Sequence, residues 1–436
     1  MIPKALIAVA AVVIIAGAAV GVYFVTNNND KDSGSNSLEG FDGLVYGNAN
    51  GDAVVDSADV TLINKIINGD ESLDKYPLAD ANLDGKVNDA DLQIVNKIIA
   101  NQPTKIIVND THNNVEIDFP MDKIFAAGGT NMRVLIQVLD MEPKLVACAT
   151  TSYYNSNMDY TLTNLLDSGD LPTVSTAATK DDFKKLNTIK AEKGLNVAIL
   201  ENRSITGYNE DAATAIFKDL HVGVLILECE SIFELKTSLA TLGIAIGKQD
   251  KAKQMIDILD NTLNEIKTKA GDKYGTATVM CITMSNSVSG TLSDYYAMTQ
   301  LAGGKNLADW SEKTRVFDKG DTWLYESKYN PEFLFHFKSM KYGDNPSATD
   351  LDAYRGYFKE TNAYKDGHYY LINGVVPLHV RLAWMAQIMY PDKISSGWSD
   401  EIFQQYLDTF GDLNEGKTKG DSGYFDVTEH DYHWSV

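Results

Sequence analysis

Oxygen-bearing side chains recur at the same spacing in two stretches of the chain, residues 48–59 and residues 80–91. Each stretch places Asn or Asp at its positions 1, 3, 5, 9 and 12, a spacing that surrounds Ca2+ with oxygen ligands, and position 7 adds a backbone carbonyl. Hard oxygen ligands on a tight turn suit calcium better than a softer metal. The expected ligands are Asn48, Asn50, Asp52, Val54, Asp56 and Asp59 of the first loop and Asp80, Asn82, Asp84, Lys86, Asn88 and Asp91 of the second loop.

We expect two calcium sites, of which the second is the stronger. The second loop has Gly85 at position 6, where the chain must turn sharply, whereas the first loop has Ala53 there and opens with Asn48 instead of Asp. Two Asx-rich turns that cap helices are the alternative interpretation. Calcium is favoured because both loops lead in register into helical runs that share Asn-Lys-Ile-Ile, residues 64–67 and residues 96–99.

Two short loop–helix repeats of this kind resemble a dockerin, a small all-α, EF-hand-like domain. As in dockerins, each loop ends in Asp instead of the bidentate Glu of an ordinary EF-hand. The resemblance covers about residues 44–102, within an expected domain of residues 44–104, and implies a cohesin-bearing protein as a partner. The recognition positions 10 and 11 are Ser57-Ala58 and Asp89-Ala90, which departs from the Ser/Thr pairs common in dockerins.

Composition narrows the remaining classes of function. The chain of 436 residues has room for about two to three domains. Its formal net charge of −22 at pH 7 argues against nucleic acid and against an anionic membrane surface as partners. Three cysteines, Cys148, Cys229 and Cys281, lie far apart in apolar sequence and are predicted to be buried thiols without a disulfide framework.

The N-terminal segment 1–26 is predicted to be a transmembrane anchor. Residues 5–25 are uncharged and almost wholly apolar, long enough as a helix to cross a bilayer. Lys4 precedes this run and acidic residues follow it, so the positive-inside rule places the bulk of the chain outside the cell membrane. A cleaved signal peptide is the competing interpretation. Residues 27–43, rich in Asn, Ser, Gly and Asp, are expected to form a flexible stalk.

From Lys105 onward the chain alternates strand and helix patterns, which predicts an α/β fold. The strands fall into two sets, so we expect two Rossmann-like lobes. Between them, residues 231–246 read as a helix ended by Gly247, and Asp250 is expected to cap a long rigid helix that joins the lobes. The predicted strands begin at Ile106, Val115, Ile124, Leu145, Val197, Val222, Ala277, Phe333 and Tyr369.

Several segments together resemble the class III solute-binding proteins of ABC transporters, which take up ferric siderophores, haem or cobalamin. They are residues 106–127, 135–147, 242–252, 301–308, 330–335, 363–370 and 385–391. The resemblance spans 105–412, with lobe one at 105–248, the bridging helix at 250–270 and lobe two at 271–412. It implies capture of a metal chelate between the lobes and delivery to an ABC permease. The last residues, 413–436, are expected to be an unstructured acidic tail.

The resemblance places the ligand-binding residues on loops that follow strands. The candidates are Tyr153, Tyr154, Arg203 and Tyr208 in the first lobe and Trp323, His379 and Arg381 in the second. Arginine suits ligand carboxylates and aromatic rings suit flat ligands, although a surface aromatic or an ion pair within a lobe would look the same. Asp182 and Glu326 stand near the places where the family carries an acidic residue for permease docking.

Two other classes of function stay open. One is a cell-surface enzyme displayed through the dockerin-like domain, against which no G-x-S-x-G, H-E-x-x-H or paired-carboxylate pattern is found. The other is a scaffold or adhesion protein with calcium-dependent cohesin binding. Free zinc or manganese is disfavoured as the ligand because the chain has only seven histidines and no evident histidine cluster in its first lobe.

Overall fold

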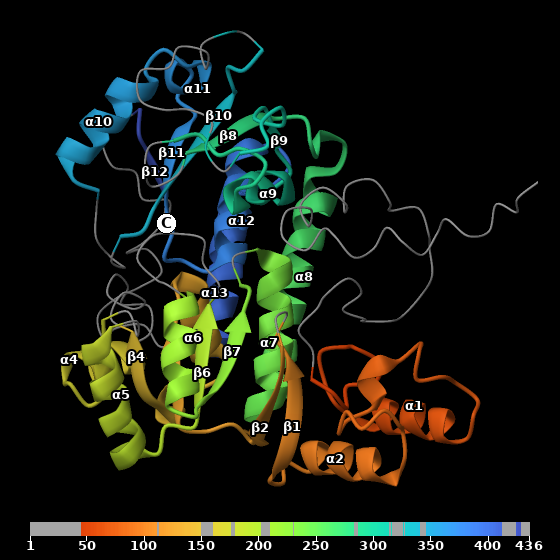
Figure 1. Cartoon of the computed structure of the whole chain (residues 1–436). Coiled ribbons are helices and arrows are strands. Elements are labelled where there is room, and N and C mark those ends of the chain that lie inside the picture. The colour runs from red at the N-terminus through yellow and green to blue at the C-terminus, as the bar shows by residue number, and fades with distance from the viewer. Residues whose placement is uncertain are drawn as a thin grey trace, which may run out of the picture.

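The computed structural model describes residues 45–110, 113–149, 160–175, 179–201, 210–229, 231–282, 287–313, 315, 326, 328–340, 346–411 and 424–428. They form a small helical domain and two α/β lobes, which follow one another along the chain (Figure 1). The predicted anchor 1–26 and stalk 27–43 lie outside these ranges. Within them, no helix has both the length and the apolar character that a membrane span requires.

The helical domain contains α1 (Ser57–Ile67), the 3-10 turn η1 (Pro77–Ala79) and α2 (Asp89–Ile99). Each long helix begins inside the last third of an acidic loop. The N-cap residues, Asp56 and Asn88, each form a capping box with the aspartate three residues later, so the loop and the helix start share their hydrogen bonds. The buried core of this domain includes Val45, Val55, Ile63, Val95 and Ile98.

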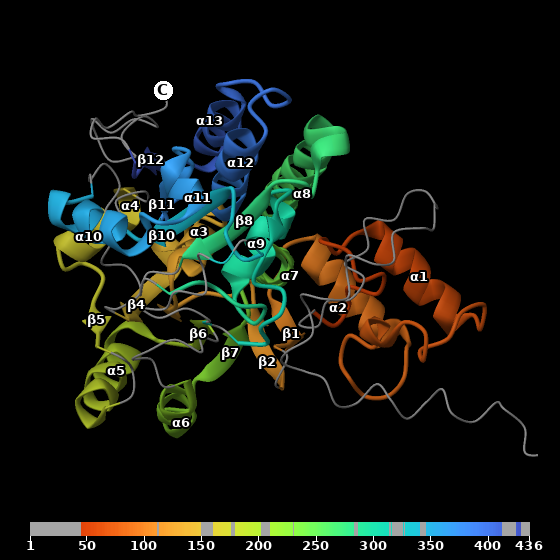
Figure 2. The ribbon, with the colours of Figure 1, turned by 90° about the horizontal axis from the view of Figure 1, so that it is seen from above.

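The helical domain is attached directly to the first lobe. Val45 forms a β-bridge with Val108, and the Tyr46 amide donates to the carbonyl oxygen of Ile107 at 2.9 Å. Seen from above, α1 and α2 lie to one side of the two lobes, with α2 next to strand β1 (Figure 2). The domain therefore packs on the body of the chain.

The first lobe opens with an antiparallel hairpin, β1–β2, made of the strands predicted at Ile106 and Val115, and continues as a five-stranded parallel sheet in the order β5-β4-β3-β6-β7. Its inner strands are buried along their whole length and are apolar except for Glu201 at the end of β6, since both faces of the sheet are covered. The elements are β1 (Thr104–Asn109), β2 (Asn114–Phe119), β3 (Ile124–Ala127), α3 (Thr130–Val138), η2 (Glu142–Lys144), β4 (Leu145–Ala149), α4 (Tyr160–Asp167), β5 (Thr173–Val174), α5 (Lys180–Lys193), β6 (Val197–Glu201), α6 (Glu210–Asp219) and β7 (Gly223–Leu227).

Two long helices, α7 (Ile232–Ile246) and α8 (Gln249–Ala270), follow the first sheet and meet at a tight corner. Gly247 ends α7 with a φ of +76°, a left-handed conformation that favours glycine. Helix α8 has 22 residues, packs along α7 and leads into the second lobe (Figure 1). The expected connecting helix is therefore present, but the prediction that Asp250 caps it is wrong, because α8 begins at Gln249 and Asp250 lies in its first turn.

The second lobe has a five-stranded sheet in the order β12-β11-β10-β8-β9, parallel except for β12. The expectation of an unstructured tail is wrong for β12 (Tyr424–Asp426), which pairs antiparallel with β11 at the edge of this sheet. The other elements are η4 (Gly271–Lys273), β8 (Thr278–Ile282), α9 (Asp294–Leu301), β9 (Lys305–Asn306), β10 (Phe333–Lys338), α10 (Ala348–Phe358), α11 (Asn362–Lys365), β11 (Tyr369–Asn373), α12 (Leu378–Met389) and α13 (Trp398–Phe410).

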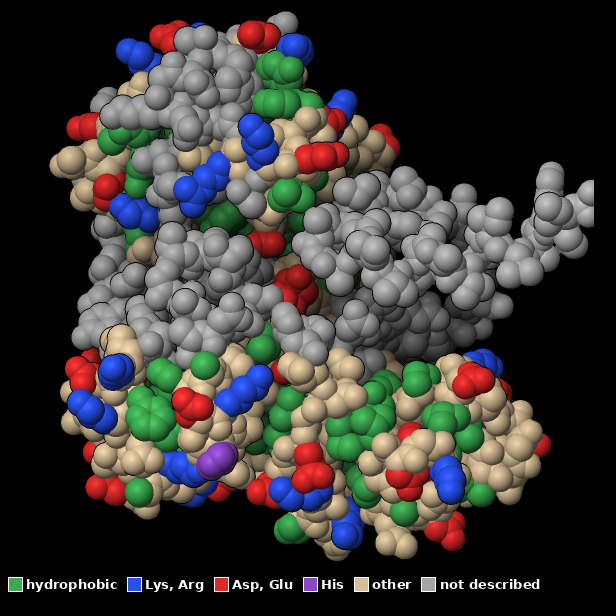
Figure 3. All heavy atoms as spheres, viewed as in Figure 1, with side chains coloured by type: hydrophobic (Ala, Val, Ile, Leu, Met, Phe, Trp, Pro, Cys, Tyr) green, Lys and Arg blue, Asp and Glu red, His purple; other side chains and the backbone are tan. Residues whose placement is uncertain are grey.

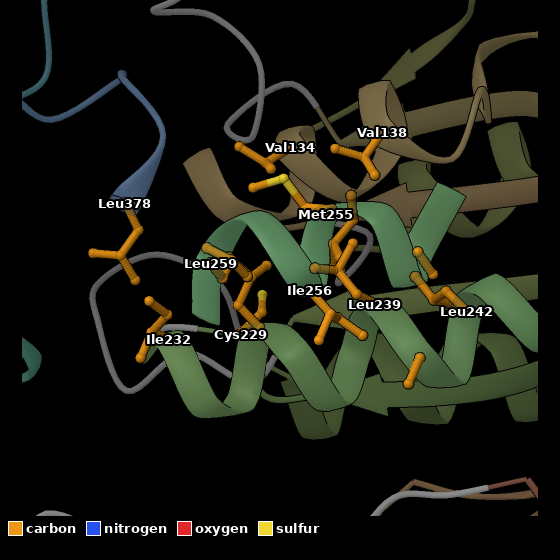
Figure 4. Packing of buried hydrophobic residues seen from close by; sticks show 14 of the residues in the cluster. Val134, Val138, Cys229, Ile232, Leu239, Leu242, Met255, Ile256, Leu259 and Leu378 are labelled. Atoms are coloured by element: carbon orange, nitrogen blue, oxygen red, sulfur yellow. The ribbon is translucent and has the colours of Figure 1, made fainter. Parts of the chain in front are cut away.

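One hydrophobic core runs through both lobes. It contains Val134 of α3, Met255 and Leu259 of α8 and Leu378 of α12 (Figure 4). Residues of the helical domain belong to the same core. Each lobe adds a separate core on the outer side of its sheet. All three cysteines, Cys148, Cys229 and Cys281, are buried, as predicted. Because the lobes share a dry core, separating them would expose apolar surface to water, which opposes a wide opening motion.

Candidate calcium loops and ligand site

The first loop gathers a buried carboxylate and an unpaired buried oxygen. The Asp59 carboxylate accepts hydrogen bonds from the backbone amides of Asn50 (3.1 Å) and Asp56 (2.8 Å). Burial raises the pKa of the Asp59 carboxyl to about 7. Oδ1 of Asn48 is buried without a hydrogen-bond partner among the described residues. A cation held between these oxygens would satisfy the Asn48 oxygen and favour the ionised form of Asp59, so the residues present fit calcium.

The second loop repeats this arrangement. The Asp91 carboxylate accepts from the amides of Asn82 (3.2 Å) and Asn88 (2.8 Å), and burial raises its pKa as well. Asp80 accepts from the Gly85 amide at 2.7 Å, and Gly85 has a φ of +85°. A side chain at that φ would be strained, so the glycine expected at position 6 is required by the turn.

Carboxylates alone do not complete either calcium site. In the described part of the chain, no three His, Cys, Asp or Glu side chains converge as metal ligands would. The Asp52 and Asp84 carboxylates instead accept hydrogen bonds from the amides of Val54 (2.9 Å) and Lys86 (3.0 Å) in their own loops. Calcium binding would therefore draw on asparagine and backbone oxygens too, and would turn these carboxylates inward.

The positions that the dockerin resemblance assigns to partner recognition are accessible. Ser57, Ala58 and Asp89 are exposed at the starts of α1 and α2. Ile67 and Ile99, at the equivalent ends of the same helices, are 38% and 41% exposed. These two are among the few exposed large hydrophobic residues of the described chain.

Strand β7 of the first sheet and strand β11 of the second each lead, at their carboxyl ends, into a helix whose first residue lies in the shared hydrophobic core. Ile232 opens α7 after strand β7, Leu378 opens α12 after strand β11, and both belong to the cluster drawn in Figure 4. In open α/β sheets ligands bind at the carboxyl ends of the strands. The region between β7 and α7 in the first lobe and between β11 and α12 in the second is therefore the candidate ligand site.

Two predicted ligand residues, His379 and Arg381, lie in the first turn of α12 at this site. Burial, together with the charge of Arg381, lowers the pKa of His379 to about 3, so the imidazole is neutral. Neither ring nitrogen of His379 has a hydrogen-bond partner in the described chain. Arg381 is 5% exposed, and its Nε likewise has no partner there. Burial lowers the pKa of Arg381 to about 10, which leaves the guanidinium charged at neutral pH.

The first-lobe side of the site contains a buried acid that sequence reasoning missed. Glu201, the last residue of β6, accepts a hydrogen bond from the backbone amide of Gly129 at the start of α3. A Cβ at Gly128 would lie 2.4 Å from the Glu201 carboxylate, so only glycine fits there. Asn131 donates to the carbonyl oxygen of Cys229 at 2.6 Å and joins α3 to the end of β7. The Gly128-Gly129 pair was the only available signal in the sequence.

Five of the predicted ligand residues cannot be placed. Tyr153, Tyr154, Arg203, Tyr208 and Trp323 lie outside the described residues. Their roles remain predictions.

The two predicted permease-docking residues differ in accessibility. Glu326 is exposed and lies 3.9 Å from the Lys328 ammonium. Asp182 is buried in the capping box of α5, where it accepts from Ser175 and Thr179. Although burial would raise its pKa, these hydrogen bonds lower it. The docking role of Asp182 does not fit this geometry, because its carboxylate is occupied within the lobe, whereas the side chain of the neighbouring Asp181 is 92% exposed.

Comparison with known proteins finds one matching domain family and a curated relative of limited similarity. Residues 46–100 match the dockerin type I domain. The petrobactin-binding protein YclQ of Bacillus subtilis (strain 168) is 25% identical over 188 residues, which cover 43% of this chain and 56% of that protein. The chain thus spans about half the length of this curated relative.

Solved structures agree with the two-lobed fold. A periplasmic solute-binding protein from Veillonella parvula DSM 2008 has a TM-score of 0.55 at 16% identity and covers 73% of this chain and 95% of its own. Helicobacter pylori CeuE with Ni(II) bound has a TM-score of 0.54 at 16% identity and covers 71% and 97%. The chain therefore combines the fold of the solute-binding proteins of ABC transporters with a match to the dockerin type I domain. These relatives are described as binding proteins, not as enzymes.

Proposed function

We propose that this chain is the solute-binding protein of an ABC importer and captures a metal chelate, such as a ferric siderophore, haem or a corrinoid, between its lobes. The observation that carries the proposal is the environment of Arg381, whose guanidinium is buried and whose Nε has no hydrogen-bond partner in the described chain. A buried cation without a counter-charge is costly. An anionic ligand at the carboxyl ends of the sheets would supply that charge.

The chemistry of the site suits a ligand that brings its own metal. The side chain of Arg381 can engage two oxygens of a carboxylate or catecholate group at once. His379 is neutral, and its position in the first turn of α12 lets an anion also benefit from the partial positive charge of a helix N-terminus. The helix between the lobes and their shared core support a small closing motion on binding.

The remaining parts of the chain suit display at a cell surface. We infer that residues 5–25 anchor the chain in the cell membrane with its bulk outside, on the basis of their uncharged apolar sequence. The two acidic loops would each bind one calcium ion, the second more tightly, and the loaded binding domain would dock on an ABC permease. Extracellular calcium is abundant enough for sites of modest affinity.

A second function, calcium-dependent binding of a cohesin-bearing protein, is favoured by the exposed Ile67 and Ile99. Figure 3 also shows hydrophobic side chains on the visible face of the helical domain. Ile67→Glu and Ile99→Glu would weaken such a complex without changing chelate binding. Equal capture of a cohesin module by both variants and the parent would contradict this second function.

Titration of the purified chain with a ferric catecholate, a ferric hydroxamate, haemin and cyanocobalamin tests the main proposal. The chain has 22 tyrosines and five tryptophans whose fluorescence reports binding. We expect saturable quenching by one chelate class. The absence of saturable quenching by all four would count against chelate capture.

A further inference from the structure

We propose that Gln249, the first residue of the helix that joins the lobes, is a positioning residue for calcium in the first loop. Its side-chain oxygen accepts a hydrogen bond from the Val55 amide at 2.9 Å, and its side-chain nitrogen donates to the Val55 carbonyl at 3.1 Å. One side chain of the binding domain thus holds both backbone groups of one loop residue. The inference rests on the proposed calcium site in the first loop.

The hydrogen bonds between Gln249 and Val55 matter for calcium because Val55 lies between two of the expected ligands. Val55 is fully buried and lies between Val54, whose carbonyl is the expected ligand at position 7, and Asp56, the ligand at position 9 and the N-cap of α1. Fixing the peptide groups on either side of Val55 fixes the direction of both ligands. Groups that orient metal ligands in this way govern metal affinity although they do not touch the metal.

Among the described residues, no side chain of either lobe holds the second loop in this way. Val87 stands where Val55 stands in the first loop, and its backbone forms no hydrogen bond to either lobe in the described chain. The first loop is the one with the poorer ligand sequence, since it has Asn48 at position 1 and Ala53 at position 6. The contact with Gln249 therefore stabilises the first loop, whose own ligand sequence is the less favourable for calcium.

The residues around the junction of α7 and α8 also contact both the helical domain and the first lobe. Gly247 approaches Asn101 at the end of α2 so closely that an added Cβ would lie 2.3 Å from the Asn101 side-chain oxygen. On the other side, Lys248 and Lys251 pair with Asp140 of the first lobe at 3.0 and 2.6 Å. These contacts restrict the backbone on both sides of Gln249 and therefore hold its side chain near Val55.

Linkage makes the effect reciprocal. If Gln249 strengthens calcium binding in the first loop, calcium must strengthen the bond between that loop and the start of α8 by the same free energy. Calcium outside the cell would then stabilise the attachment of the dockerin-like domain to the binding domain. Gln249 would thereby couple calcium binding in the dockerin-like domain to the attachment of that domain to the solute-binding domain.

The test is isothermal calcium titration of the full chain in an Asp84→Ala background, which disables the second loop and leaves the first to be measured alone. Gln249→Met preserves the length of the side chain and removes both hydrogen bonds, and Gln249→Ala removes the side chain. Gln254→Ala, at an exposed position of the same helix, is the matched control. We expect both Gln249 variants to bind calcium about tenfold more weakly and the control to bind as the background does.

Hydrogen exchange of the first amides of α8 gives a second readout, since a purely structural role would not make their protection depend on calcium. We expect calcium to slow exchange there, and Gln249→Met to remove that effect. Equal calcium affinity with and without the Gln249 substitutions would overturn the positioning role while leaving the calcium site intact. No calcium uptake by the Asp84→Ala chain would overturn both.

Discussion

The Tyr406 hydroxyl of α13 donates a hydrogen bond to the side-chain oxygen of Gln137 of α3 at 2.7 Å, and both residues are buried. This bond joins the second lobe to the first. A second bond, from the Trp398 ring to Glu265 at 2.8 Å, ties α13 to the connecting helix α8. Together with the shared core, these contacts of helix α13 stabilise the packing of the second lobe against the first.

Removal of the Tyr406 hydroxyl is expected to weaken the contact between α13 and α3. We predict that Tyr406→Phe lowers the free energy of unfolding by about 1 kcal/mol, the usual net value of one buried hydrogen bond. Urea denaturation followed by circular dichroism measures the change. Tyr364→Phe, in which a half-buried tyrosine loses a hydroxyl with no hydrogen bond in the described chain, should cost much less. Equal effects of the two substitutions would show that the Tyr406 bond contributes nothing.

The stability of the fold should fall in acid because of His379. The pKa of this imidazole is lowered by burial to about 3, below its unfolded value, so the unfolded chain binds the proton more readily. The stability that the neutral histidine contributes is complete above about pH 6.5 and is lost as the pH falls toward 3. We predict that His379→Gln loses about 2 kcal/mol less stability than the parent between pH 7.5 and pH 5. Parallel pH profiles of the two proteins would contradict a buried neutral imidazole.

Gly128 and Gly356 form a matched pair of glycines with opposite expected effects. At Gly128 an added Cβ would lie 2.4 Å from the Glu201 carboxylate and 2.5 Å from Cβ of Met132, whereas at Gly356 in α10 it would meet nothing within 4 Å. Gly128→Ala should destabilise the chain by about 1–3 kcal/mol through overpacking. Gly356→Ala should stabilise it by up to about 1 kcal/mol through helix propensity. Thermal unfolding of both variants checks the signs, and an increased Tm for Gly128→Ala would be inconsistent with this packing.

The two calcium loops are expected to differ in affinity. A chelator-competition titration of the full chain should resolve two sites, because both loops supply the oxygen ligands that calcium requires. Asp84→Ala should remove the tighter site, and Asp52→Ala, at the same position of the first loop, should remove the weaker one. Loss of the tighter site in Asp52→Ala would reverse the predicted order.

Much of the fold could be predicted because the relevant signals are local. The strands at Ile124, Val197 and Phe333 are short apolar runs, and the corner after α7 is marked by a glycine. Strand β12 was not predictable, because a three-residue edge strand forms only when β11 is already beside it. The N-cap of α8 was expected at Asp250 but is Lys248, whose side chain makes no capping hydrogen bond.

The candidate site was only partly predictable from sequence. Arg381 and His379 could be named because they follow a recognisable strand near the end of the second lobe. The burial of Asp182 could not be predicted from the sequence, because a capping aspartate and an exposed aspartate have no distinguishing sequence pattern. The contact between Gln249 and Val55 joins residues far apart in the chain and leaves no local pattern at all.

Chelate binding by the parent chain and by an Arg381 variant tests the central claim most directly. The chelate that binds best in the four-compound titration would be titrated into the parent chain, Arg381→Ala and Arg381→Lys, with circular dichroism to verify folding. We predict saturable binding by the parent, a loss of at least about tenfold in Arg381→Ala and partial recovery in Arg381→Lys, because lysine restores the charge but not the planar fork. Equal affinity in the folded Arg381→Ala variant would contradict the claim that this buried cation receives the ligand.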